Sequence, residues 1–307
     1  MVMLYILINP SSHRRRSRQI WRQIEKELKN EKIPYQCIVS RNHEDIDHAA
    51  ASLSSDGSEK TVVILGGDGT LNEFLNGLTD TSHIRIGYIP IGSGNDFARG
   101  MGITMNYKEE LDLILHDKQT RQIHYGIVSY SSGREKKFFV SAGIGYDARV
   151  CYEVDHSRLK SLLGMLGLGR LVYLFIGVQH LLRARTYTAS LSVDGETALE
   201  GEGFLFASFH MLPYEGGGFK FCPDQRPEED MLHICVAKGI AKKKIPFIIP
   251  QALLGTHIYR EGVYQYRCSE ARIQASQPEY VHTDGETDHQ YTSIRLSVSP
   301  DCITFLN

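Results

Sequence analysis

The segment 63–78, VILGGDGTLNEFLNGL, places three glycines between a β-branched apolar run and a helical pattern. The apolar run predicts a buried strand. Leu71, Phe74, Leu75 and Leu78 stand at positions i, i+3, i+4 and i+7, which predicts a helix with one packed face. A glycine-rich turn between a strand and a helix lets backbone N–H groups approach an anion, and the helix adds its positive end. The segment therefore favours an α/β fold with an anion site at a strand end.

The same order of strand and helix recurs from residue 3 to about residue 125. Ile20, Trp21, Ile24 and Leu28 form one helical stripe within 18–28. Such alternation predicts a mostly parallel sheet covered on both faces, with ligands bound at the carboxyl ends of its strands. The strands expected in this half are 3–8, 35–39, 61–65 and 84–91.

The pattern changes in the second half to short alternating runs separated by turn residues. This texture predicts an antiparallel, β-rich and β-sandwich-like domain with two helices, at 162–182 and 246–254, packed on it. We therefore expect an α/β domain over 1–125 and a β-rich domain over 126–307, whose last strand can return to the first domain. The strands expected here are 137–141, 188–193, 203–209, 231–237, 271–275 and 293–298.

Composition limits the classes of partner. The 307 residues contain 34 Lys and Arg against 36 Asp and Glu, a net charge of -2, which gives no electrostatic case for nucleic acid as the main partner. The six cysteines form no CxxC pair and are typical of free thiols in a reducing cytosol. Arg170 and several glycines interrupt the apolar segment 162–182, so it predicts a buried helix pair or a membrane-contacting surface and no transmembrane segment.

A second glycine turn, IPIGSGNDFAR at 89–99, strengthens the case for a phosphate site. Taken alone, Asp68 in GGDG fits a helix-capping aspartate as well as a phosphate site in which Mg²⁺ lies between the charges. The turn matches neither GxxxxGK[ST] nor GxGxxG. Because the second turn also follows a strand and carries glycines and an aspartate, we expect the two turns to form one pocket.

These motifs together resemble the diacylglycerol kinase catalytic-domain family in its soluble bacterial form, which is related to sphingosine kinases and more distantly to NAD kinases. NPSS at 9–12, SAGIGYDA at 141–148, GGG at 216–218 and DGE at 284–286 follow in the family's order. The resemblance implies an NAD kinase/diacylglycerol kinase-like fold and a cytoplasmic kinase, peripheral to the membrane. This kinase would use ATP and Mg²⁺ to phosphorylate a lipid hydroxyl in the cleft between an ATP-binding first domain and a lipid-binding second domain.

The resemblance also implies roles for single residues. Asp68 would lie beside the phosphates and metal, Glu286 would be the general base, and Asp96 and Asp147 would order water and metal. A structural Mg²⁺ would bind Asp230, with carbonyls near Pro227 and Leu232. ATP would contact Asn9, Pro10, Ser11, Ser12, His13, Ser40, Gly67, Asp68, Gly69, Thr70, Leu71, Asn72, Glu73, Ser93 and Asn95.

Two departures and one duplication bear on these roles. His13 stands where the family usually has glycine, and Met231 follows Asp230 where glycine is usual. The tetrapeptide DGET occurs at 194–197 and again at 284–287; we assign the base to Glu286, since only the second copy lies in the family's order. Two alternatives stay open, a kinase of a soluble acceptor resembling NAD kinase and a nucleotide-binding regulator without catalysis. The identity of the lipid substrate and the formation of a homodimer also stay open.

Overall fold

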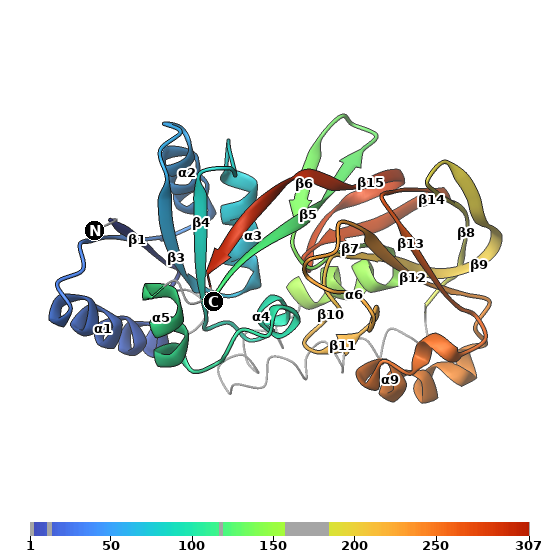
Figure 1. The fold of residues 1–307 in the computed structure, drawn as a ribbon. Helices are drawn as coiled ribbons and strands as arrows, with labels where there is room; N and C mark the ends of the chain where they lie inside the picture. The colour runs from blue at the N-terminus through green and yellow to red at the C-terminus, as the bar shows by residue number, and fades with distance from the viewer. Residues whose placement is uncertain (1–2, 11–13, 117–118, 157–183, 307) are drawn as a thin grey trace. The chain divides into compact units, whose positions relative to one another are not determined.

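The computed structural model of the protein describes residues 3–10, 14–116, 119–156 and 184–306 (Figure 1). Ser11, Ser12 and His13 and the helix expected at 162–182 lie outside these residues. The chain forms two compact units, one of Met1–His124 with Pro300–Asn307 and the other of Tyr125–Ser299. Within the described ranges, no helix combines the length and the apolar character needed to cross a membrane.

The first unit is built around five strands in the order β2-β1-β3-β4-β15, and each neighbouring pair is parallel. All seven residues of β3 are buried, as expected for a central strand covered on both faces. The strands are β1 (Leu4–Ile8), β2 (Tyr35–Val39), β3 (Lys60–Gly66), β4 (Ile84–Pro90) and the end of β15 (Glu286–Leu306).

Five helices lie among the described residues of this unit, and α1 packs its predicted stripe into the core. Ile20, Ile24 and Leu28 of α1 join a buried cluster with Ile6 of β1 and Ile114 of α5. This confirms the helix that periodicity predicted at 18–28, which the structure extends at both ends. The helices are α1 (Arg14–Asn30), α2 (His43–Ser54), α3 (Asp68–Gly77), α4 (Asp96–Met101) and α5 (Tyr107–Leu115).

The second unit is β-rich, as predicted, and the strand pairings within its described residues are antiparallel. A buried cluster that includes Phe138, Phe209 and Leu296 forms its core. The strands are β5 (Thr120–Tyr130), β6 (Glu135–Phe138), β7 (Ser141–Gly145), β8 (Tyr187–Val193), β9 (Glu196–His210), β10 (Tyr214–Glu215), β11 (Phe219–Lys220), β12 (Leu232–Lys238), β13 (Val263–Cys268), β14 (Glu270–Thr283) and β15. The helices are α6 (Tyr146–Asp155), α9 (Ile245–Leu254), which confirms the helix expected at 246–254, and the short 3-10 turns η1 (Lys242–Lys244) and η2 (His257–Tyr259).

Two predictions about these strands were wrong. The strands expected to be short include β9 with 15 residues, β14 with 14 and β15 with 21. Register shifts between Gln274 and Glu279 bend the β14–β15 ladder, so its alternating pattern is interrupted while the pairing continues. The single strand expected at 137–141 is two strands, because the N–H groups of residues 139–141 donate to the Asp284 carboxylate.

The pairing of Gly126 with Phe138 across β5 and β6 gives a test of the core. Phe138 is fully buried, and a Cβ at residue 126 would lie 2.0 Å from its ring. Gly126→Ala should therefore lower the free energy of unfolding by about 1–3 kcal/mol, measured by chemical denaturation. If the clash is the cause, Gly126→Ala should be less damaging in a Phe138→Leu background, whereas simply additive effects would contradict it.

Candidate functional site

The ends of three strands of the first unit are tied together by backbone and side-chain contacts. The N–H of Asn9, after β1, donates to the carbonyl of Leu65 in β3 at 3.1 Å, and Nδ2 of Asn9 donates to Oγ1 of Thr70 at 2.9 Å. A Cβ on Gly92 would lie 2.6 Å from the Cα of Gly67. The two glycine turns therefore approach each other as closely as backbone permits, and only glycine fits at Gly92.

The Asp68 carboxylate caps the helix that follows the second turn. Its Oδ2 accepts a hydrogen bond from the N–H of Asp96 at 2.9 Å, and its Oδ1 accepts one from the N–H of Phe97 at 3.2 Å. These are the first two residues of α4. A carboxylate has about four lone-pair sites, so both oxygens keep acceptor capacity for a cation or a water. Asp68 joins the two predicted turns and can still act as a ligand.

The second turn is fixed by its own side chains. Asn95 has φ 51°, in the left-handed region, and its Nδ2 donates to the carbonyl of Gly92 at 3.0 Å. The Oδ1 of Asn95 is buried and has no hydrogen-bond partner in the part of the chain that the structure describes. Arg99 forms an ion pair with Asp96 and donates to the carbonyl of Gly94 at 3.3 Å. Ser93, at the tip of this turn, is exposed.

The other residues expected to contact ATP lie on the same strand ends or on α3. The Ser40 hydroxyl is buried and donates to the carbonyl of Ile8 at 3.3 Å, so it faces the backbone of β1. Glu73 pairs with His43, and Oδ1 of Asn72 accepts from Asn76 at 3.1 Å. Pro10 follows β1, and Gly69, Thr70 and Leu71 lie in the first turn of α3. The role of all these residues in binding ATP stays a prediction.

The two DGET copies have the same local geometry in the second unit. Asp194 and Asp284 both have φ 48°, and each aspartate–glycine pair connects two antiparallel strands. Asp194 Oδ1 accepts from the N–H groups of Ser269 and Glu270, each at 3.0 Å. Asp284 instead accepts from the N–H groups of residues 139–141 at 2.8, 2.8 and 2.9 Å. The two copies therefore have the same turn conformation, and their aspartates differ in the backbone N–H groups that they bind.

The two glutamates that follow these turns have different surroundings. Glu286 begins β15, and its Oε2 lies 3.1 Å from Nζ of Lys136 on β6. The side chain of Lys136 is 15% exposed and that of Glu286 is 38% exposed. Glu196 begins β9 and is exposed. The Lys136 ion pair therefore orients a half-buried carboxylate at the second copy.

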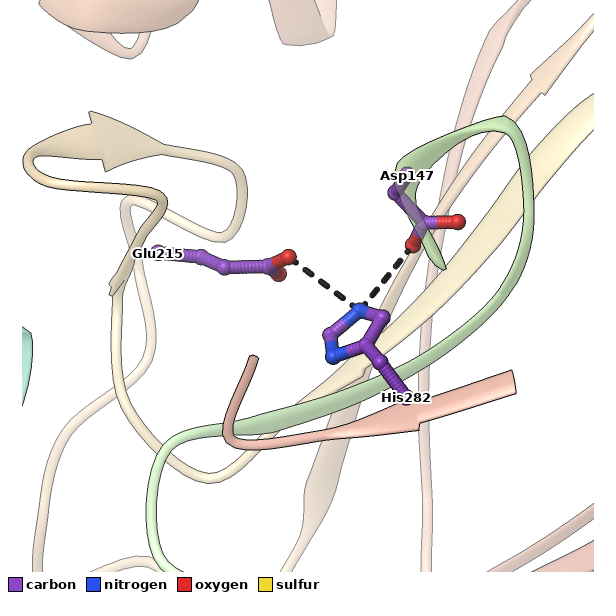
Figure 2. Close-up of side chains that lie close together, drawn as sticks. All are labelled: Asp147, Glu215 and His282. Carbon is purple, nitrogen blue, oxygen red and sulfur yellow. Dashed lines mark ion pairs between the residues drawn. The ribbon is translucent and has the colours of Figure 1, made fainter. Parts of the chain in front are cut away.

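A buried cluster of Asp147, Glu215 and His282 lies in the same unit, and both carboxylates point at the imidazole (Figure 2). Nε2 of His282 is 3.4 Å from Oδ2 of Asp147 and 3.3 Å from Oε1 of Glu215. Asp147 was expected near the site, whereas Glu215 and His282 were not predicted. Their signals in the sequence, a glutamate before GGG and a histidine two residues before DGE, gain meaning only once the strands are paired.

Burial and charge decide the protonation of this cluster. Burial by itself would lower the pKa of His282, but the charges of Glu215 and Asp147 outweigh it and raise the pKa to about 10. Burial opposes the ionisation of Glu215, yet the charge of His282 holds the pKa of Glu215 at about 2. Burial raises the pKa of Asp147. Near neutral pH the cluster therefore contains a buried Glu215–His282 ion pair beside Asp147.

Two residues of this cluster, Asp147 and Glu215, are also among those that line an apolar cavity of about 160 Å³. Side chains of α6, β9, β12 and α9 form most of its surface, among them Val150, Phe206 and Ile249. The cavity thus combines an apolar interior with two acidic groups. An amphiphilic ligand, with an apolar chain and a polar group, matches both features.

Two sets of residues bear on metal binding. Among the predicted ligands, Asp230 is exposed, Pro227 is half-buried and Leu232 is buried at the start of β12. Nε2 of Gln225 donates to the carbonyl of Met231 at 3.1 Å and so helps to close this loop. Within the described residues, donor atoms of Asp147, Glu215 and His282 lie within 4.8 Å of one another, close enough to hold an ion. The His282 proton supplies positive charge at that place.

Replacing Glu215 with Gln tests the charge arrangement of the cluster. His282 should not titrate between about pH 6 and 8 in the wild type, because its pKa is about 10. Without the Glu215 charge the pKa of His282 should fall, because burial lowers it and the Asp147 carboxylate is left to oppose burial. Imidazole NMR resonances followed against pH measure this change. Glu229→Gln is the control, because it removes the partner of His233 in a separate, more exposed pair and should leave the pKa of His282 unchanged.

Glu215→Gln also tests how the free energy of unfolding depends on pH. A raised folded-state pKa means that the His282 contribution is complete below about pH 6.5 and is lost as pH rises towards 10. The difference in unfolding free energy between the wild type and Glu215→Gln should therefore shrink over that range. A difference that stays constant to about pH 10 would contradict the ion pair.

Known proteins match the whole chain. The model of the diacylglycerol kinase catalytic domain matches residues 3–128. The model of the YegS C-terminal NAD kinase beta sandwich-like domain matches residues 140–307. A Bacillus subtilis (strain 168) relative, named "Putative lipid kinase YtlR", is 27% identical over 305 residues, 96% of each chain. A diacylglycerol kinase of Mycobacterium tuberculosis is 28% identical over 248 residues, 80% of this chain and 77% of the relative.

Solved structures share the fold. A structure from Bacillus anthracis str. Sterne, described as that of a "putative diacylglycerol kinase", has a TM-score of 0.77 at 19% identity and covers 99% of this chain and 96% of that chain. This likeness and the match of the second unit confirm the expected two-domain fold of the NAD kinase/diacylglycerol kinase type. Residues 3–128 therefore belong to the diacylglycerol kinase catalytic-domain family, and residues 140–307 belong to the family of the YegS C-terminal NAD kinase beta sandwich-like domain.

Proposed function

We propose that the protein is an ATP- and Mg²⁺-dependent lipid kinase that transfers the γ-phosphate of ATP to a lipid hydroxyl. The observation that carries this proposal is the apolar cavity of the second unit, which Asp147 and Glu215 help to line. A fully soluble acceptor would leave such apolar walls without a partner, whereas a lipid chain would bury them. The names of the relatives, a lipid kinase and a diacylglycerol kinase, agree with this acceptor.

In the proposed reaction the first unit holds the nucleotide. The backbone at Gly67 and Gly69, together with the N-terminus of α3, offers N–H groups to the phosphates. Asp68, whose carboxylate is fixed by two N–H groups and keeps lone pairs, suits a Mg²⁺ ion bound to those phosphates. When bound, this ion neutralises phosphate charge, and Asp68 then anchors the nucleotide in place of repelling it.

Glu286 is the proposed general base of the second unit. Lys136 orients one oxygen of the Glu286 carboxylate, and the remaining lone pairs accept the proton of the lipid hydroxyl. The hydroxyl oxygen then bonds to the γ-phosphorus of ATP while the bond to the β–γ bridging oxygen breaks and ADP leaves. Asp96 and Asp147 are proposed to order water and metal. A structural Mg²⁺ is proposed to bind Asp230 and the carbonyls near Pro227 and Leu232. The exposed carboxylate of Asp230 fits a hard cation, while the loop around it is also closed by Gln225. We place the protein in the cytoplasm, with its lipid substrate at the membrane surface.

A kinase of a soluble acceptor is the second candidate. The second unit matches an NAD kinase beta sandwich-like domain, which is the specific observation in its favour. Labelled ATP supplied with a panel of lipids and with NAD separates the two, because only one class of acceptor should become labelled. Transfer to none of these acceptors, with ATP binding intact, would point to a nucleotide-binding regulator.

The duplicated DGET sequence supplies a matched test of the base. Glu286→Gln keeps the shape of the side chain but removes its capacity to accept a proton, so kcat should fall by about 10²–10⁴-fold. Glu196→Gln, at the same position of the other copy, should leave kcat unchanged. The measurement is the rate of ³²P transfer from ATP to the lipid that the panel identifies. Wild-type kcat in Glu286→Gln would refute the assignment.

The contact between the two glycine turns predicts a loss of nucleotide binding. Gly92→Ala would place a Cβ 2.6 Å from the Cα of Gly67, and neither backbone can yield without moving a turn. ATP should bind about tenfold more weakly or worse, measured by calorimetry, while circular dichroism checks the fold. Gly57→Ala meets no atom within 4 Å but strains a left-handed residue with φ 67°, so it controls for backbone strain without a clash between the turns. Unchanged ATP affinity in Gly92→Ala would remove this turn from the proposed site.

A further inference from the structure

Large apolar side chains are exposed together on α9 and η2. Of eight such exposed side chains among the described residues, four lie between Phe247 and Tyr259. Phe247 and Leu254 are each 73% exposed, Tyr259 is 83% exposed and Leu253 is 46% exposed. Apolar side chains clustered in this way on a protein surface mark a site of interaction. We call Phe247, Leu253, Leu254 and Tyr259 the α9 surface.

The opposite face of α9 belongs to the cavity. Ile245, Ile248, Ile249 and Ala252 line it and stand at i, i+3, i+4 and i+7, which is one face of a helix. Phe247 and Leu254 are seven residues apart and share the other face. One short helix therefore separates the apolar cavity from the exposed apolar side chains.

The charge around the α9 surface is mainly basic in the sequence. Lys242, Lys243, Lys244 and Arg260 flank it, and no acidic residue occurs from 239 to 260. Lys243 and Lys244 are exposed, and Lys244 makes an ion pair with Glu261 at 3.3 Å. This local excess contrasts with the net charge of -2 for the whole chain. A partner of this surface should therefore be negatively charged around an apolar interior.

We propose that the α9 surface docks on an anionic phospholipid bilayer. Apolar side chains beside lysines are the combination that places a helix at the headgroup boundary, where the chains enter the acyl region and the lysines meet anionic headgroups. A second copy of the chain fits less well, because a two-fold contact would set this basic surface against itself. The inference deepens the proposed lipid kinase, since a lipid that leaves the bilayer beside α9 meets the cavity on the other side of the same helix.

Binding to vesicles tests the proposal without any measurement of activity. The wild type should co-sediment with vesicles of phosphatidylglycerol and phosphatidylcholine, more weakly with phosphatidylcholine alone, and less at high salt. The double variant Phe247→Ser/Leu254→Ser should bind the anionic vesicles at least about tenfold more weakly. Val39→Ser, which removes an exposed apolar side chain from β2, is the matched control and should bind as the wild type does. Circular dichroism and melting temperature confirm that the variants fold.

A second variant tests the charge. Lys243→Glu/Lys244→Glu should weaken binding to anionic vesicles and leave the weak binding to phosphatidylcholine unchanged. Wild-type vesicle binding by Phe247→Ser/Leu254→Ser would overturn the proposal. So would light scattering that shows a wild-type dimer and a monomeric variant whose vesicle binding is unchanged, because the surface would then serve self-association.

The same proteins separate this inference from the proposed function. With a short-chain lipid dissolved as monomers, Phe247→Ser/Leu254→Ser should phosphorylate at the wild-type rate, because docking is no longer needed. If the wild type phosphorylates no lipid but the variant alone loses vesicle binding, the docking surface stands and the kinase proposal fails. If lipid phosphorylation is found and vesicle binding does not depend on Phe247 and Leu254, the kinase proposal stands and the docking surface fails.

Discussion

The Asp284 carboxylate, which accepts hydrogen bonds from the N–H groups of residues 139–141, is the contact on which the second unit's site depends. It ends β6, begins β7 and fixes the turn that presents Glu286. The register of β7 with β14 then sets Gly143 opposite His282. A Cβ on Gly143 would lie 2.0 Å from Oδ2 of Asp147 and 2.5 Å from Nε2 of His282, so the absence of a side chain there lets these two groups meet.

The Asp68 carboxylate fixes a loop of the first unit in the same way. Each aspartate belongs to a motif that we propose takes part in catalysis, and each uses its carboxylate to hold consecutive backbone N–H groups of another segment. An alanine at either position would therefore release a loop, and a loss of activity would not by itself identify chemistry. The Glu286 carboxylate instead pairs with the Lys136 side chain and holds no such loop among the described residues. This difference makes the glutamate the cleaner probe of catalysis.

The sequence predicted the features that depend on neighbouring residues and missed those that depend on residues distant in the chain. The strands 35–39 and 84–91 and the helix at 246–254 were predictable, because continuous apolar runs and helical spacing are local signals. The length of β14 was not, since a bulge breaks the alternation within a continuous ladder. Glu215 and His282 were missed because only the tertiary fold brings them together, Glu215 from β10 and His282 from β14 of another sheet. Asp194 and Asp284 show the limit most plainly, for identical tetrapeptides make identical turns and differ only in distant partners.

The buried Glu215–His282 pair and the apolar cavity impose opposite demands on a ligand. Removing two charges from water is unfavourable, and mutual attraction in a poorly screened interior offsets that cost only while the pair stays intact. A strongly charged ligand that enters the cavity beside Asp147 and Glu215 would disturb this pair, whereas an uncharged one would leave it intact. An uncharged polar group such as a hydroxyl brings no net charge near His282. The lining of the cavity therefore favours an uncharged ligand with an apolar chain.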